Sequence, residues 1–340
     1  MRIESIIRAL DDPTRLRIMR LLSTMELAVG ELATVLGQSQ PRVSRHVAIL
    51  CDAGLAERRR EGSWVFLRQA ISERGGGAME RSLAHLLAAG EAEDAEFADI
   101  CAADRRHLAA IRDTRERSAA EYFARHAGEW DNLRALLVPA DQVEAALLDA
   151  LADAPLGRLL DIGTGTGRIA ELLAPSADHI VALDKSPEML RLARARLQGL
   201  PATSVELVQG DFGALPLPDG GFDTVIFHQV LHYAQEPAYA LAEAARVCRP
   251  GGRIAIVDLA AHGREELRSR HAHARLGFAD EQMRAMLGRQ GFVPAATRTL
   301  DDGQLAVNIW TGTRKGDPVT TLDPARRRTS NSPTKKAQAK

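Results

Sequence analysis

The sequence has 340 residues, of which 26% are charged and 45% are hydrophobic, and its formal net charge is −1. This length exceeds one ordinary domain and supplies apolar material for two cores, so two folded units are expected. No stretch approaches about eighteen uncharged apolar residues and the first twenty residues hold five arginines, so a soluble, cytoplasmic protein without a membrane partner is predicted. The three cysteines, Cys51, Cys101 and Cys248, lie too far apart for a disulfide scaffold or a C-x-x-C metal clip.

Charge is distributed unevenly along the chain. Residues 1–75 hold 12 basic and 9 acidic side chains, whereas residues 76–150 hold 8 and 15. Residues 316–340 hold 6 basic and 2 acidic side chains and few apolar ones, so this tail is predicted to be disordered. An anionic partner is expected to prefer the first segment or the tail.

The first segment predicts a helix-turn-helix motif. Apolar residues recur at helical spacing over 29–36, and Gly37 supplies a C-terminal stop. A second helix is predicted after Ser39, with Pro41 in its first turn. Its polar face carries side chains that donate to phosphates or to base edges in the major groove, namely Gln40, Arg42, Ser44, Arg45 and His46.

A wing is predicted after the second helix. Two short strands, 55–60 and 63–68, flank a turn that contains Gly62. Three neighbouring arginines are expected to contact phosphates without regard to base sequence: Arg58, Arg59 and Arg60. Charged helix faces and arginine runs are often only solvated, but the order of helix, turn, helix and wing favours binding of double-stranded DNA.

The segments LDDPTRLRIMRLL and SRHVAILCDAGLAERRREGSWVFLR resemble the winged-helix ArsR/SmtB family of bacterial transcriptional regulators over about residues 2–70. The resemblance implies a homodimer, formed largely through its first and last helices, on a palindromic operator. Metal-sensing members of that family carry two cysteines in the pattern ELCVCDL, where this chain reads ELAVGEL with Ala28 and Gly30. Cys51, Asp104 and His107 are too sparse to replace those ligands, so no metal site and no metal or arsenite sensing are expected.

Strands and helices alternate from residue 156 to residue 314, which predicts an α/β domain with a parallel sheet. A strand over 158–162 leads into Gly163, Gly165 and Gly167 and then into a helix over 169–173. Glycines are needed where a backbone turns sharply and approaches a ligand closely. The spacing G-x-G-x-G differs from the dinucleotide pattern G-x-G-x-x-G and resembles the loop of class I methyltransferases that use S-adenosylmethionine (SAM).

Later strands are predicted at 180–183, 205–208, 222–227, 253–259 and 306–312. Asp184 ends the first of these, where its carboxylate is expected to accept hydrogen bonds from both hydroxyls of a ribose. Asp211 and Phe212 follow the next strand and resemble the methyltransferase pattern of a carboxylate at the adenine amino group and an aromatic ring beside the adenine. Together these positions predict an adenosine ligand.

The motifs DIGTGTG, VALDKSPEML, QGDF, FDTVIFHQVLHY and ARVCRPGGRIAIVDL resemble the UbiE-like branch of the class I methyltransferases over about residues 156–314. The expected fold class is therefore an α+β winged helix-turn-helix domain followed by an α/β Rossmann-like class I methyltransferase domain. The resemblance implies that SAM or its demethylated product S-adenosylhomocysteine (SAH) binds, and EYFARHAGEWDNLR, similar to the helix before this domain, implies that Tyr122, Phe123 and Trp130 cover it. The implied cofactor-binding residues are Asp161, Gly163, Gly165, Gly167, Asp184, Lys185, Met189, Asp211, Phe212, His228, Tyr122 and Trp130.

Methyl transfer is an in-line displacement that needs a base only when the acceptor must lose a proton. His228 and His232 are the candidates for such a base, and no catalytic residue is assigned. His271 and His273 lie on a predicted lid, and each of these four histidines also fits a structural role. Arsenic methylation is not expected, because Cys248 is the only cysteine of this segment.

The expected organisation is a DNA-binding domain at 1–75, a helical dimerisation and connecting segment at 76–150, a methyltransferase domain at 151–315 and a basic tail at 316–340. The preferred hypothesis is a transcriptional regulator, acting as a repressor, whose second domain binds SAM or SAH as an effector that controls operator affinity. The alternative is an active methyltransferase of a small-molecule acceptor whose first domain provides autoregulation.

Overall fold

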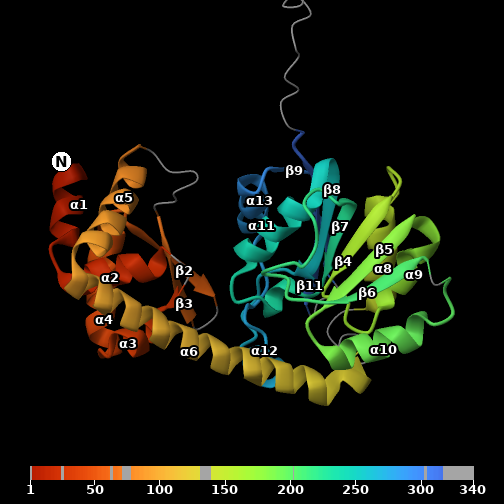
Figure 1. Ribbon diagram of the computed structural model, residues 1–340, viewed down its shortest axis with the longest axis horizontal. Helices are drawn as coiled ribbons and strands as arrows, with labels where there is room; N and C mark the ends of the chain where they lie inside the picture. Colours follow the sequence, from red (N-terminus) through yellow and green to blue (C-terminus); the bar gives the residue numbers. More distant parts are fainter. Residues whose placement is uncertain are drawn as a thin grey trace, which may run out of the picture.

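A computed structural model describes residues 2–23, 27–61, 64–70, 78–130, 139–201, 203–301 and 305–316. It contains two domains, which a long helix joins along one side of the molecule (Figure 1). The predicted turn at Gly62 and the predicted tail beyond Gly316 lie outside the described residues.

The first domain is a helix-turn-helix with a small antiparallel sheet in the order β1-β3-β2. Asp12 caps the second helix by accepting a hydrogen bond from the Arg15 amide at 3.1 Å, and Gly37 ends the third in the left-handed conformation at φ +64°. The elements are α1 (Arg2–Leu10), α2 (Pro13–Leu22), β1 (Leu27–Ala28), α3 (Val29–Leu36), α4 (Gln40–Asp52), β2 (Ala56–Glu61) and β3 (Trp64–Gln69). The predicted helix-turn-helix and wing are confirmed.

Two helices lie between the domains in the sequence, and the second of them reaches from one domain to the other. They are α5 (Ala78–Glu93) and α6 (Ala95–His126), and the short 3₁₀ helix η1 (Ala127–Glu129) follows them. Leu83, Leu87 and Leu108 belong to the apolar core of the first domain, so these helices complete that domain rather than merely follow it.

The second domain is built on a mixed sheet in the order β10-β11-β8-β7-β4-β5-β6, with β9 paired to β11. Its central strands are parallel, and Leu160 pairs with both Val181 and Val225. The strands are β4 (Arg158–Ile162), β5 (His179–Asp184), β6 (Val205–Gln209), β7 (Phe222–His228), β8 (Cys248–Leu259), β9 (Phe292–Pro294), β10 (Arg298–Asp301) and β11 (Ala306–Arg314).

Two details of the predicted sheet are wrong. The sheet is not wholly parallel, because β11 runs antiparallel to β8, β9 and β10. The strand predicted at 253–259 begins earlier, at Cys248, because Cys248 pairs with Phe222 and, after a register shift, Arg253 pairs with Thr224, so that the Pro-Gly-Gly residues form an irregularity within the strand. Neither feature is encoded in the local apolar pattern.

Helices cover both faces of this sheet (Figure 1). Leu147, Ile169 and Ala193, from α8, α9 and α10, pack on one face, and Leu241 and Leu287, from α11 and α13, pack on the other. The bounds are α8 (Ala140–Leu151), α9 (Arg168–Leu173), η2 (Ala174–Ser176), α10 (Pro187–Leu197), η3 (Leu231–Tyr233), α11 (Pro237–Val247), α12 (Glu266–His271) and α13 (Asp280–Arg289). Within the described part of the chain, no helix has the length and apolar character that a membrane crossing requires.

Candidate functional site

A cavity of about 470 Å³ lies at the carboxyl ends of the parallel strands of the second domain. Such an edge is where open α/β sheets bind ligands, because loops from several strands converge there. The structure brings ten of the twelve predicted cofactor-binding residues to the wall of this cavity: Asp161, Gly163, Gly165, Asp184, Lys185, Met189, Asp211, Phe212, His228 and Trp130. The remaining two, Gly167 and Tyr122, are not part of the wall.

The glycine loop forms a cradle that larger residues would fill. Gly163 has φ +73°, and a Cβ there would collide with the Val230 side chain. Gly165 has φ +56°, and the Trp130 indole nitrogen lies 3.7 Å from the position of its missing Cβ. Gly167, at φ +81°, instead allows α9 to pack closely on Ala193, so its role is in helix packing.

Two carboxylates stand at the ends of neighbouring strands. Asp184 accepts hydrogen bonds from the amides of Gly165 and Ser186, each at 2.8 Å. Burial raises the pKa of Asp184, and these amide hydrogen bonds oppose that rise. Asp184 therefore ties the glycine loop to the end of β5.

Asp211 is already paired within the protein. Its carboxylate accepts a hydrogen bond from the Gly213 amide at 2.7 Å and lies 2.8 Å from the Lys185 ammonium. Burial alone would raise the pKa of Asp211, but the Lys185 ammonium and the Gly213 amide lower it below its ordinary value. Lys185 thus neutralises Asp211 at the cavity wall.

Three aromatic rings pack together in the cavity wall, and one of them, Trp130, lies beside Gly165 of the glycine loop. The ring centroids of Phe123 and Trp130 are 5.2 Å apart, and those of Phe123 and Tyr233 are 4.9 Å apart. All three rings line the cavity, whereas the Tyr122 hydroxyl makes a 2.9 Å hydrogen bond with Nδ1 of His271. Phe123 and Trp130 thus lie in the cavity wall, and Tyr122 does not.

The two candidate bases lie in different surroundings. His228 lines the cavity, whereas His232 is 4% exposed, and its Nδ1 makes a 2.6 Å hydrogen bond with the fully buried Asp258. The His273 ring lies 4.3 Å from the His232 ring between centroids and is tilted to it by 38°, and neither of its ring nitrogens has a hydrogen-bond partner among the described residues. Of the two candidates, only His228 is placed to face a ligand.

Sequence reasoning missed part of the cavity wall. The residues concerned follow β7, in and just after the motif that supplied His228: Gln229, Val230, Tyr233, Gln235, Glu236 and Tyr239. These residues could have been predicted from their position in the sequence, because the loop after any central parallel strand lies at the edge of the sheet where the ligand cavity forms.

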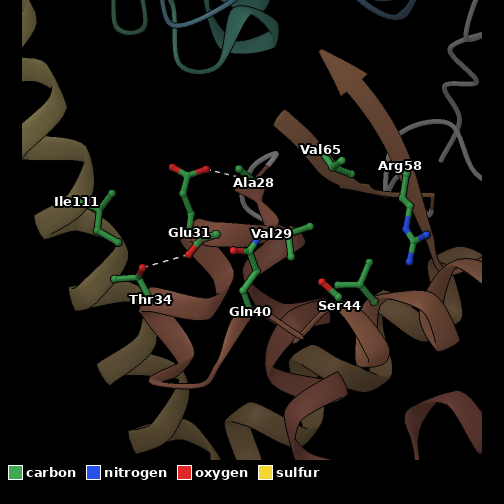
Figure 2. A pocket seen from close by; sticks show the side chains of 11 residues that line it. Ala28, Val29, Glu31, Thr34, Gln40, Ser44, Arg58, Val65 and Ile111 are labelled. Carbon is green, nitrogen blue, oxygen red and sulfur yellow. Dashed lines mark hydrogen bonds between the residues drawn. The ribbon is translucent and has the colours of Figure 1, made fainter. Parts of the chain in front are cut away.

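The predicted DNA-contacting residues divide between two surfaces of the first domain. Gln40 and Ser44 of α4 and Arg58 of β2 line a hollow of about 680 Å³, which Ile111 of α6 borders on another side (Figure 2). Ala28 and Gly30 line the same hollow, and the Ala28 amide donates to the Glu31 carboxylate at 2.7 Å. Among the described residues, no three His, Cys, Asp or Glu side chains gather as a metal site.

The other recognition-helix residues lie outside this hollow. Arg42 and Arg45 are exposed, as a DNA-contacting role requires. The His46 side chain is only 13% exposed, and its Nδ1 lies 3.6 Å from the Asp12 carboxylate. Arg59 and Arg60 lie in β2, and the structure describes their backbone but not their side chains.

Both domains match known families. Residues 12–58 match the family described as bacterial regulatory protein, arsR family, and residues 160–256 match the family described as methyltransferase domain. An uncharacterized 37.1 kDa protein in a transposon of Streptomyces fradiae is 43% identical over 119 residues, which are 34% of this chain and 34% of that protein. An uncharacterized methyltransferase of Mycobacterium tuberculosis is 41% identical over 110 residues, which are 32% of this chain and 43% of that protein.

Among solved structures, the YcgJ protein of Bacillus subtilis aligns with a TM-score of 0.46 and 20% identity, covering 52% of this chain and 100% of that chain. The chain spans between a third and a half of the length of the two curated relatives named above.

Proposed function

Since this chain joins an ArsR-type DNA-binding domain to a SAM-dependent class I methyltransferase domain, we propose that it is a transcriptional repressor whose second domain binds SAM or SAH as an effector. The observation that carries this proposal is the continuity of α6, which spans 32 residues. Its Leu108 is part of the core of the first domain, and its Phe123 lines the cavity of the second. A ligand that orders the cavity therefore acts on a helix that the DNA-binding domain contains.

The cavity residues fit an adenosine-bearing sulfonium compound. The glycine loop allows a ligand to lie close to the backbone, because no side chain projects there. The remaining lone pairs of Asp184 can accept hydrogen bonds from ribose hydroxyls. Asp211 and Phe212 would hold the adenine, and Phe123, Trp130 and Tyr233 would exclude water from the sulfur end. When bound, SAM would supply a positively charged sulfonium with a transferable methyl group, and SAH is the neutral thioether that remains.

Operator binding is assigned to the exposed arginines of α4 and to the wing. Arg42 and Arg45 would enter the major groove, and Arg58 would contact the adjacent backbone. In the proposed homodimer, two such helices would read the two halves of a palindromic operator. Because linkage is reciprocal, a ligand that changes operator affinity is itself bound more or less tightly when DNA is present.

The proposed domain limits are those expected from sequence, 1–75, 76–150, 151–315 and 316–340. Separate apolar cores in the first domain and on each face of the second sheet support the division into two folded units. The packing of Leu83, Leu87 and Leu108 supports one refinement, namely that the connecting helices fold with the first unit.

The test is a titration of operator DNA in buffer, in saturating SAM and in saturating SAH. An operator is first selected from random double-stranded DNA with the purified protein, and ligand saturation is verified by calorimetry. We expect one ligand to change the operator Kd at least about fivefold, within the usual range of allosteric coupling. Arg45→Ala should lose operator binding and keep ligand binding. Equal Kd values in all three conditions, with both ligands bound, would contradict the effector role.

A second candidate function is methyl transfer to a small-molecule acceptor. The presence of His228 and Tyr239 in the cavity wall favours it, because these side chains can orient an acceptor and move a proton. Incubation of the protein with methyl-labelled SAM and a cell extract should transfer the label to an extractable acceptor if the domain is active. Retention of all label in SAM, by a protein that calorimetry shows to bind SAM, would contradict this candidate.

A further inference from the structure

The wing packs against the methyltransferase domain through one aromatic side chain. Phe66 lies on β3, the central strand of the wing sheet, and is only 5% exposed. Its neighbour Leu67 is part of the core of the first domain, whereas Phe66 is not, because successive side chains of a strand point to opposite faces. In Figure 1 the wing strands lie on the side of the first domain that faces the second.

Two arginines of the second domain cover the Phe66 ring. The guanidinium carbon of Arg275 lies 4.6 Å from the ring centroid, and that of Arg268 lies 5.7 Å from it. Both distances are within the range of a cation–π contact, which is stronger where water is excluded. The Arg275 side chain is 4% exposed and the Arg268 side chain 12%, so Arg275 forms the drier contact.

Arg275 is also bonded to the cavity wall. Its guanidinium donates to the Gln235 carbonyl at 2.5 Å and lies 4.0 Å from the Glu236 carboxylate, and its amide donates to the His232 carbonyl at 2.8 Å. Gln235 and Glu236 line the ligand cavity. One guanidinium group therefore contacts both the cavity wall and the aromatic ring of the wing.

The segment that carries both arginines is held firmly on its other side. Gly277 has φ +75°, and a Cβ there would collide with the Ala260 carbonyl just beyond β8. Arg268 donates to the Ala274 carbonyl at 2.5 Å, which fixes the turn between the two arginines. A shift of the cavity wall at 235–236 must then move the Arg275 guanidinium relative to Phe66, because this backbone has little freedom to absorb it.

We propose that Arg275 is the positioning residue through which the ligand cavity controls the wing, with Phe66 as its partner. This inference rests on the proposed function and specifies its route. Ligand contacts on 229–236 would change the placement of Arg275, and the altered contact with Phe66 would change the placement of β2 and β3 on DNA. The competing route is α6, which touches both domains and bypasses Phe66.

The test compares ligand coupling in variants of the contact. Coupling is the ratio of operator Kd values without ligand and with saturating SAH or SAM, whichever gives the larger effect on the wild type. Phe66→Leu keeps an apolar side chain but removes the aromatic ring. Arg275→Lys keeps the positive charge but removes the planar guanidinium group. We expect both ratios to fall to within about twofold of one, whereas Phe66→Tyr, which keeps the ring face, should retain the wild-type ratio.

Two controls separate coupling from general damage. Arg284→Lys changes a half-buried arginine of the same domain on α13, which bonds the Ala295 carbonyl, and should leave the ratio unchanged. The SAH affinity of Phe66→Leu, measured by calorimetry, should stay within about threefold of wild type, since reciprocal linkage allows only a small change. Wild-type ratios in both Phe66→Leu and Arg275→Lys would overturn the inference and assign the coupling to α6.

Hydrogen exchange distinguishes failure of this inference from failure of the proposed function. The amides of 65–69 are followed with and without SAH in the absence of DNA. If SAH changes the exchange rates of these amides about threefold or more in wild type and not at all in Phe66→Leu, the contact between Arg275 and Phe66 is supported as the route. This holds even if the operator Kd of the wild type does not respond to ligand. No exchange change in wild type at calorimetric saturation overturns the contact as a route, even if the operator Kd does respond.

Discussion

At position 163 the backbone conformation and the lack of room for a Cβ both require glycine. The left-handed φ disfavours any side chain, and Val230 occupies the volume that a Cβ would need. We expect Gly163→Ala to destabilise the second domain by about 1–3 kcal/mol and to weaken SAH binding at least about tenfold. Thermal unfolding and calorimetry measure the two effects.

A second glycine serves as the matched control. Gly288 lies inside α13, and a Cβ there would meet nothing within 4 Å. Gly288→Ala should therefore stabilise the domain by about 0.5–1 kcal/mol without changing SAH affinity. If both variants bind SAH equally well, Gly163 does not form the ligand cradle.

His273 makes the stability of the second domain depend on pH. Burial is the main reason why its pKa is lowered, and the neighbouring His232, His262, His271 and Arg268 lower it further. The unfolded chain takes up a proton near pH 6.5 and the folded chain does not, so stability is full above that pH and is lost as the pH falls below it. We expect urea titrations to show that His273→Phe reduces the loss of unfolding free energy between pH 7.5 and 5.5 by about 1 kcal/mol. The same loss in wild type and variant would show that the pKa of His273 is not lowered in the folded state.

Among the elements, α6 is joined to α2 by a buried ion pair in addition to the apolar packing of Leu108. Asp104 is 3% exposed and accepts hydrogen bonds from Nε and Nη2 of Arg17 at 2.8 and 2.6 Å. Asp104→Ala leaves the Arg17 guanidinium partly buried without this partner, so we expect the first domain to lose about 3 kcal/mol of stability in denaturant titrations.

The exposed pair between Arg8 and Glu4 on α1 provides the comparison. Its side chains are 81% and 55% exposed, so Glu4→Ala should cost less than about 0.5 kcal/mol. Equal losses in the two variants would mean that burial of Asp104 adds nothing to the attachment of α6.

For the whole molecule, exposed apolar side chains on the first domain favour the proposed homodimer. Ile3 and Ile7 on α1 are 51% and 63% exposed, and Leu86 on α5 is 65% exposed. These are the first helix and one of the last helices of the DNA-binding unit, as the resemblance to ArsR regulators implies. Such side chains are stabilised when a partner covers them.

The combined variant Ile7→Glu and Leu86→Glu should therefore be monomeric by sedimentation and should bind the operator at least about tenfold more weakly, because one half-site is lost. Val293→Glu, which changes an exposed apolar residue of β9 that is 54% exposed, should leave the mass and the affinity unchanged. A dimer that survives the combined variant would place the interface elsewhere.

The sequence was most informative where the signal is local. The limits of α3 and α4 follow from helical spacing, Gly37 and Ser39, and the glycine loop and Asp184 follow from strand ends and special backbone conformations. It was least informative where residues far apart in sequence meet. Tyr122 bonds His271 across 149 positions, and His232 is buried against Asp258, so neither side chain could be placed from its own motif.

The same division holds for the molecule as a whole. Length and composition predicted two folded units, and the resemblance of local motifs to ArsR regulators and class I methyltransferases predicted the kind of each, because these signals lie in residues within a few turns or strands of each other. The tertiary structure decided that β11 runs antiparallel to β8, that the histidines divide between the cavity and the interior, and that Phe66 meets Arg275. These outcomes depend on which surfaces from distant parts of the sequence pack against each other. A periodic pattern of apolar residues indicates that a residue is buried, but it does not identify the neighbour that buries it.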